Sequence, residues 1–186
     1  MIDKTALDGC LRWINNDKIR EWTKDWLMNE TPDYFWEIPA SSTGKYHPKY
    51  AVEERGLVKH TKAVFQIALD QLDDGVWGFD DTERDIILSA ILLHDTRKSG
   101  VPKQDYTVSN HATLVADAIR KECKKGSLRW QIADGIASHM GQWNKDYKTD
   151  EIVAPVPATE LQFFIHLCDY LSSRKYMEIN FERVRV

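Results

Sequence analysis

The chain contains 186 residues, of which 42% are hydrophobic and seven are tryptophan, so it can bury one substantial core and we expect a single domain over residues 1–186. A formal net charge of −4 gives no support for broad nucleic-acid binding. Three cysteines at irregular spacing argue against a disulfide framework, and neither an N-terminal signal pattern nor an apolar run of membrane-spanning length appears, so we expect a cytoplasmic protein without a membrane partner.

The apolar residues follow a helical period along almost the whole chain, and glycine and proline are sparse. The expected fold class is therefore all-α, a helical bundle. Residues 3–29 are predicted to form one or two amphipathic helices that cap the bundle, and residues 31–48 are irregular because of their Pro, Ser and Gly content. Five further helices are expected at about 52–73, 82–95, 109–124, 127–141 and 158–176.

The expected ends of these helices carry residues that suit them. Three side chains are placed to cap helix starts, namely Ser109, Ser127 and Thr159. Two glycines are placed to end helices, namely Gly126 and Gly141. The following loop, 142–157, contains two prolines and lies between two candidate metal ligands, so we expect it to overhang their site.

A side chain that can bind metal lies on the apolar face of each of the five later helices. These residues are His60, His94, His111, His139 and Asp169. One buried histidine is usually explained by a hydrogen bond to a backbone carbonyl, but a buried polar group without a partner costs several kcal/mol. Five such residues are better explained by a shared metal centre. Asp95 adjoins His94 at the end of the apolar run 86–93, and its second oxygen can reach a neighbouring ion.

The order of these six residues and the sequence around them resemble the pattern of the HD-domain metal-dependent phosphohydrolases, and the resemblance runs from about residue 46 to residue 176. The resemblance implies an HD-domain bundle in which residues 1–45 supply N-terminal helices and a substrate-side loop, and residues 46–176 form the metal-binding core. It implies two divalent ions, iron, manganese or another transition metal. One ion would be held by His60, His94, Asp95 and Asp169. Asp95 would bridge to a second ion that is held by His111 and His139.

Several polar residues near these ligands are candidates for binding phosphate. Asp95 and Lys98 are the expected catalytic residues, because a cation beside a dimetal site stabilises the charge of a phosphoryl group in transfer. Arg97 stands where many members of the family have glycine. Arg97 and Arg174 are candidate substrate contacts, with a helix-end cation or a surface ion pair as the alternatives. The loop 41–48 adds three further candidate contacts, namely Ser42, Thr43 and Lys45.

Three more side chains require a choice between binding and packing. His166 lies three residues before Asp169, and a hydrogen bond to the site or a core position is expected for it rather than metal ligation. Trp143 and Tyr170 are candidates for stacking on a base, with core packing the default for Tyr170.

The predicted function is a metal-dependent phosphohydrolase that cleaves a phosphate ester or phosphodiester through a metal-bridging hydroxide. The expected partner is a phosphorylated small molecule such as a nucleotide, or a short RNA or DNA end. Two alternatives stay open. A diiron oxygenase of the same superfamily would use the same six ligands. A non-catalytic nucleotide-binding sensor would be expected to have a damaged ligand set, and here the set is intact.

Overall fold

The computed structural model describes residues 2–41, 44, 46–179 and 181–184. These residues form helices and loops without a named strand, and a single pair of residues, Lys145 and Ile152, forms an isolated antiparallel bridge. The all-α prediction is confirmed. No helix in the described residues has both the length and the apolar character needed to cross a membrane.

The described helices follow one another as expected, but most are shorter than predicted. The α-helices are α1 (Asp8–Leu11), α2 (Asp17–Asp25), α3 (Gly56–Asp73), α4 (Asp81–Leu93), α5 (His111–Lys121), α6 (Leu128–Ser138) and α7 (Glu160–Ser172). A π-helical turn, η1 (Trp26–Glu30), extends α2. Short 3₁₀ turns occur at η2 (Asp33–Trp36), η3 (Lys49–Ala51), η4 (Gly141–Trp143) and η5 (Glu182–Val184).

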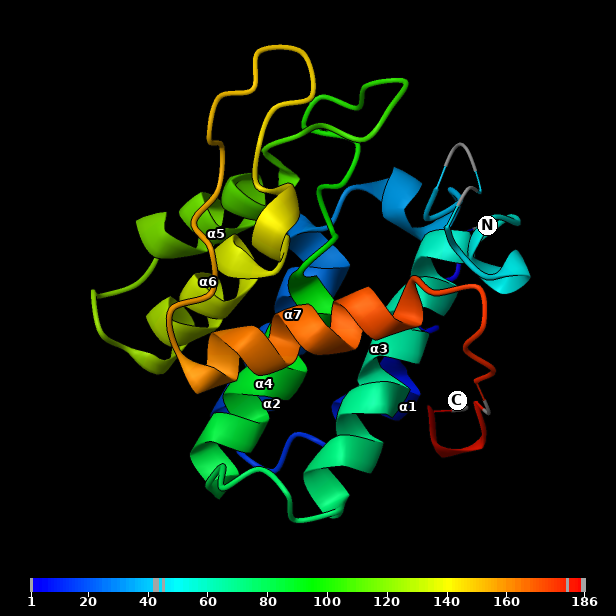
Figure 1. Cartoon of the computed structure of the whole chain (residues 1–186). Coiled ribbons are helices and arrows are strands. Elements are labelled where there is room, and N and C mark those ends of the chain that lie inside the picture. The colour runs from blue at the N-terminus through cyan, green and yellow to red at the C-terminus, as the bar shows by residue number, and fades with distance from the viewer. Residues whose placement is uncertain (1, 42–43, 45, 180, 185–186) are drawn as a thin grey trace.

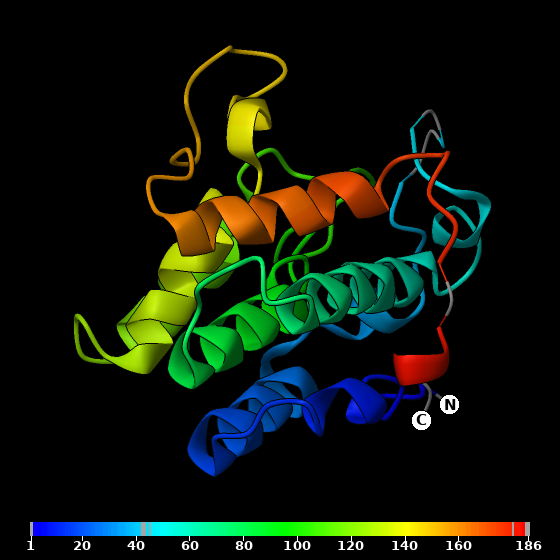
Figure 2. The ribbon, with the colours of Figure 1, turned by 60° about the horizontal axis from the view of Figure 1, so that its bottom comes forward.

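The helices lie in layers, which Figure 2 shows from the side. The long helices α3 and α4 occupy the middle, α7 packs across them on one side, and α1 and α2 lie on the other. The pair α5 and α6 flanks this stack, with α6 against α4 and α7. Figure 1 shows the loops 94–110 and 139–159 projecting side by side from one end of the molecule. The middle layer is therefore covered on both faces, which explains why α4 is buried from Asp85 to Leu93 and why α3 is buried from Gly56 to Leu69 except at Lys59 and Lys62.

Side-chain caps begin four of the described α-helices, namely α2, α4, α6 and α7. Ser127 caps α6, and Thr159 forms a capping box with Gln162 at the start of α7, as predicted. The prediction that Ser109 caps α5 is wrong. The helix begins at His111 after Asn110, and the Ser109 hydroxyl instead donates a hydrogen bond to the carboxylate of Asp146 in the neighbouring loop.

The N-terminal segment caps the bundle, as predicted, and a buried acid of α4 holds it in place. The carboxylate of Asp85 accepts hydrogen bonds from the backbone N–H groups of Asn15 (2.8 Å) and Asn16 (2.7 Å). These two N–H groups lie in the connection from α1 to α2, so the charge of a buried carboxylate is compensated by backbone donors of another layer. The two layers are thereby fixed relative to each other.

Candidate metal centre

Six predicted ligands from five helices meet at one point of the bundle. His60 lies inside α3, and His94 and Asp95 follow the last turn of α4. The others are His111 at the start of α5, His139 at the end of α6 and Asp169 in the last turn of α7. All except Asp169 are buried. Helix ends place four of these side chains, because the packing of α4, α5 and α6 brings those ends together beneath α7.

The carboxylate of Asp95 lies between two pairs of histidines. Its Oδ2 atom is 3.6 Å from Nε2 of His60 and 3.4 Å from Nε2 of His94. Its Oδ1 atom is 3.3 Å from Nε2 of His111 and 3.7 Å from Nε2 of His139. Each oxygen therefore faces a different pair of imidazoles, which is the arrangement that a bridging carboxylate needs.

Asp169 completes the first of these two groups. Its Oδ1 atom is 3.0 Å from Nε2 of His60 and 3.7 Å from Nε2 of His94. Three sets of residues each offer ligand atoms that all lie within 4.8 Å of one another, and each of the six residues belongs to at least one set. The sets are His60, His94 and Asp95; His94, His139 and Asp169; and Asp95, His111 and His139.

The other nitrogen of each ligand histidine is held by the protein. Nδ1 of His94, His111 and His139 lies 2.7–2.8 Å from the backbone carbonyl oxygen three residues earlier. These contacts fit an N–H donor at Nδ1, which leaves the lone pair on Nε2 directed at the centre. Nδ1 of His60 instead lies 3.2 Å from the hydroxyl of Ser172, which donates to the carbonyl of Asp169.

The unpaired atoms of the centre fit a metal. Nε2 of His60, Nε2 of His94 and Oδ1 of Asp95 are buried and form no hydrogen bond within the described part of the chain. Their close contacts lack hydrogen-bond geometry, and buried polar atoms are seldom left in this state. Imidazoles and carboxylates together suit divalent transition metals, so the residues present fit the metal ions that the sequence implies.

The protonation states of four of the six residues also fit ligands, whereas for His94 burial alone would lower the pKa but the Asp95 carboxylate outweighs burial and raises that pKa. Burial lowers the pKa of His60, and burial together with the nearby His94 lowers the pKa of His139 to about 3, which favours neutral imidazoles. Burial alone would raise the pKa of Asp95, but the cation of Lys98 and then His94 outweigh it and hold that pKa well below its usual range. For Asp169, His60 likewise outweighs burial, and the pKa is lowered. Both carboxyl groups are therefore ionised.

A family model of the HD domain matches residues 57–174, more than half of the chain. The chain belongs to the HD domain family. All six residues of the centre fall within the match, and HD domains are typical of metal-dependent phosphohydrolases. Comparison with curated proteins gives no match, and comparison with solved structures gives none either.

A cavity of about 510 Å³ opens over the metal centre of this HD domain. His111, His139 and Asp169 form part of its floor, and Lys98 lies beside them. The ammonium group of Lys98 is 2.5 Å from Oδ2 of Asp95, and its side chain is 13% exposed. Lys98 is thus the cation that the structure brings to the centre.

The other predicted substrate contacts are placed differently. The guanidinium of Arg97 lies over the ring of Trp26 and donates to the carbonyl of Leu114 (3.3 Å), so Arg97 packs between η1 and α5 outside the cavity. Arg174 does line the cavity. Ser42, Thr43 and Lys45 lie outside the described residues.

Three residues near the centre carry roles that sequence patterns alone did not assign. His47 lines the cavity with its ring 5.8 Å from that of His60, and burial followed by His60 lowers its pKa to about 4. Ser172 supports His60, and its spacing of three residues from Asp169 on α7 was an available signal. Tyr34 donates to the carbonyl of Gly100 (2.9 Å) and so holds the turn that carries Lys98, a long-range contact without a sequence signal.

His166 serves as a supporting residue, in line with the sequence interpretation. Its Nδ1 atom is 2.7 Å from the carbonyl oxygen of His139, and its ring lies against Gly141. Of the described loop 142–157, Trp143 alone lines the cavity. The rest of that loop projects outward beside residues 97–110, where Figure 1 shows the two loops together.

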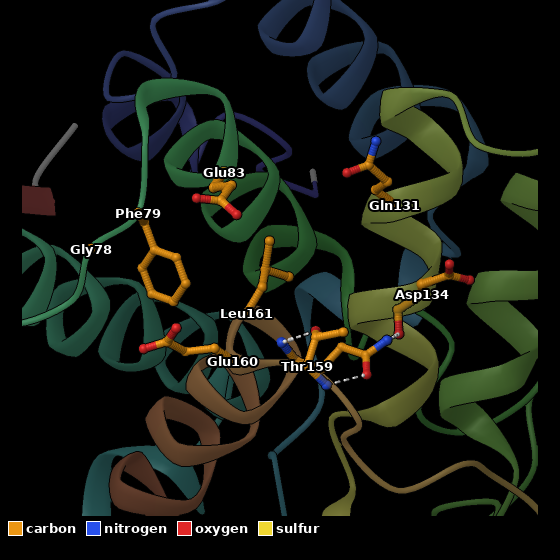
Figure 3. A pocket seen from close by; sticks show the side chains of 9 residues that line it. Gly78, Phe79, Glu83, Gln131, Asp134, Thr159, Glu160 and Leu161 are labelled. Atoms are coloured by element: carbon orange, nitrogen blue, oxygen red, sulfur yellow. Dashed lines mark hydrogen bonds between the residues drawn. The ribbon is translucent and has the colours of Figure 1, made fainter.

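A second hollow, of about 340 Å³, lies at the start of α7 and is drawn in Figure 3. Its polar groups already serve the fold. The Thr159 hydroxyl and the Gln162 side chain form the capping box, and the carboxylate of Asp134 binds Arg120 at 2.6 Å. We assign this hollow no function.

Proposed function

We propose that this HD domain is a metal-dependent phosphohydrolase that cleaves a phosphate ester or phosphodiester of a nucleotide or of a short RNA or DNA end. The observation that carries the proposal is the Asp95 carboxylate, which turns one oxygen to each pair of histidines while Lys98 approaches it from the side of the cavity. Metal binding explains why four imidazoles and two carboxylates lie together at one point inside the protein, where polar groups without partners are costly.

Two groups of residues would hold the ions. His60, His94, Asp169 and Oδ2 of Asp95 would hold one, while His111, His139 and Oδ1 of Asp95 would hold the other. This ligand type suits iron, manganese and other divalent transition metals. When bound, such ions act as Lewis acids on phosphoryl oxygens and lower the pKa of water.

The protein's own groups supply positioning and charge. Lys98 would place a cation beside the phosphoryl group, where negative charge accumulates during transfer. The Nδ1 contacts of the histidines hold the ligand side chains in place before substrate arrives, so little reorganisation accompanies the reaction. The loop residues Ser42, Thr43 and Lys45 remain proposed substrate contacts, because polar side chains and a cation suit an oxyanion.

The test is phosphate release in the absence of oxygen. The protein is loaded with Mn²⁺ or Fe²⁺ under nitrogen and incubated in ¹⁸O-labelled water with nucleoside monophosphates, cyclic nucleotides and short oligonucleotides. We expect the label to appear on the phosphate product, since hydrolysis takes its oxygen from water. Absence of product under nitrogen, together with product that forms only when ¹⁸O-labelled dioxygen is admitted and carries its oxygen, would instead identify an oxygenase of the same superfamily. An Asp95→Asn variant is the matched control and should release no phosphate.

A further inference from the structure

A column of flat side chains forms one wall of the cavity over the metal centre. The rings of Trp143 and Tyr170 are stacked, with centroids 5.6 Å apart and planes inclined by 15°. On Tyr170, the guanidinium carbon of Arg174 lies 4.4 Å from the ring centroid, and the same carbon lies 5.6 Å from the ring of Tyr46. All four residues line the cavity that also contains Asp169 and Lys98.

Trp143 is the exposed end of this column. The tryptophan residue is 50% exposed, although tryptophan is a side chain that folding normally covers. Tyr170 stacks on the indole, and the ring of His166 lies tilted against it with centroids 6.1 Å apart, yet half of the residue stays open. A large aromatic surface is thereby kept open in a cavity whose floor consists of metal ligands.

The position of the indole is set by the segment that carries a metal ligand. Trp143 lies four residues after His139 and ends the 3₁₀ turn η4, which begins at Gly141 with a left-handed φ of +57°. The connection is held by His166, whose ring contacts Gly141 and whose Nδ1 atom bonds the carbonyl of His139. The indole therefore stands at a fixed place in the wall of the same cavity that His111, His139 and Asp169 line.

The guanidinium of Arg174 strengthens the column. It donates to the hydroxyl of Ser173 and lies against two aromatic rings, and no carboxylate partner for it occurs among the residues that the structure describes. A cation on the face of Tyr170 is an attractive interaction that restrains the tyrosine ring behind the indole. A restrained aromatic surface loses little entropy when a ligand stacks on it.

We propose that Trp143 is a stacking platform for a single nucleobase whose attached phosphate lies at the metal centre. The proposal rests on the proposed phosphohydrolase function and deepens it by naming the part of the substrate that is recognised away from the metals. Stacking uses the face of a base rather than its edges, so the platform accepts all four bases and favours the larger purines.

The experiment compares two probes that differ only in the base. Adenosine 5′-monophosphate and ribose 5-phosphate are tested with the metal-loaded protein for binding by calorimetry and for hydrolysis by phosphate release. We expect the wild-type protein to prefer the nucleotide, and the Trp143→Ala variant to lose roughly 10- to 100-fold of that preference, the range of one stacked base. Trp143→Phe should restore most of the preference.

Tyr147→Ala is the matched control, since Tyr147 is an exposed aromatic residue of the same loop outside the cavity, and its substitution should leave the preference unchanged. Equal binding of the two probes by the wild-type protein, or an unaltered preference in Trp143→Ala, would overturn the stacking platform even if both probes were hydrolysed. Preferential binding of the nucleotide without phosphate release from either probe would support the platform and exclude nucleoside monophosphates as substrates of the hydrolase, whose activity on phosphodiesters is tested separately.

Discussion

The contact between Lys98 and Asp95 joins a partly exposed cation to a buried carboxylate. Without metal, this ammonium group is the main positive charge that compensates Asp95, whereas bound ions would supply that compensation themselves. The importance of Lys98 for stability should therefore depend on the metal content of the protein. Its proposed importance for catalysis should be greatest when the ions are present.

We predict that Lys98→Met lowers the free energy of unfolding of the metal-free protein by about 3–5 kcal/mol, the usual cost of leaving one partner of a buried ion pair alone. In the metal-loaded protein the loss should be much smaller, while turnover falls by about 10²-fold. Urea unfolding with and without a chelator measures the first effect. Lys103→Met, an exposed lysine of the same loop, is the control. An equal loss of stability in both forms would show that Lys98 serves only the fold.

Asp95 is the residue that faces both pairs of histidines, so the two proposed ions should respond differently to substitution of their ligands. Elemental analysis of protein purified without chelators should give about two ions per chain. His139→Ala should reduce this to about one, and Asp95→Ala should reduce it further. Lys103→Met, an exposed residue outside the centre, should keep about two. A wild-type value near one that added manganese or iron does not raise would contradict the dinuclear proposal.

At this scale the sequence predicted the positions of the ligands but not the direction of every side chain near them. His60 and His139 could be placed inward because helical periodicity relates them to apolar neighbours on the same face. Arg97 has no such constraint, and its direction depends on Trp26, which lies far away in the sequence. The position of His47 beside His60 likewise depends on how separate segments of the chain pack together, so only the folded structure shows it.

Among the elements, the connection from α6 to η4 is sterically restricted. Gly141 has a left-handed φ of +57°, and a Cβ atom there would lie 2.2 Å from Cε1 of the His166 ring. Gly126, at φ +81°, has the same backbone requirement but open space around it. Substitution of Gly126 would therefore add backbone strain alone, whereas substitution of Gly141 would add both backbone strain and a steric overlap.

We predict that Gly126→Ala costs about 1–2 kcal/mol of stability, the cost of a left-handed alanine. Gly141→Ala should cost about 1–3 kcal/mol more, because overpacking against His166 is added to the same strain. Thermal unfolding of both variants measures the difference. In the double variant Gly141→Ala/His166→Ala the additional cost should disappear, and its persistence would refute the steric explanation.

The order and type of the helices were predictable from periodicity, whereas their ends were not. The chain before α3 illustrates the cause, since Arg55 adopts a left-handed φ of +58° and the helix begins four residues later than periodicity suggests. The apolar residues 51 and 52 belong to a separate turn that packs on α3. A buried apolar residue looks the same in a sequence whether a helix or a packed turn carries it.

At the scale of the whole molecule, Arg183 ties the C-terminal turn to the middle and N-terminal layers. Its guanidinium binds the carboxylates of Asp70 (2.7 Å) and Asp73 at the end of α3, and its carbonyl accepts a hydrogen bond from the indole of Trp13 (3.2 Å). The hydrogen bond from Arg183 lowers the pKa of Asp73, with that from Arg84 contributing less.

We predict that Arg183→Ala lowers stability by at most about 1 kcal/mol at neutral pH, because these ion pairs are partly exposed. A lowered carboxyl pKa contributes stability above the unfolded value near 3.8, and that contribution is lost as pH falls through the folded pKa. The difference from wild type should thus persist from pH 7 to about pH 5 and shrink below pH 4 in urea titrations. A constant difference at low pH would assign the effect to the packing of Trp13 instead.

The distribution of the six ligands along the chain has a consequence for biosynthesis. The first candidate ligand is made at residue 60 and the last at residue 169, so a growing chain cannot assemble the whole set until α7 has left the ribosome. An ion that binds earlier would meet only some of these donors. Free histidine or thiol groups in the cell would then compete with that partial site for the ion. Loading of the complete proposed set would then be a late event in folding.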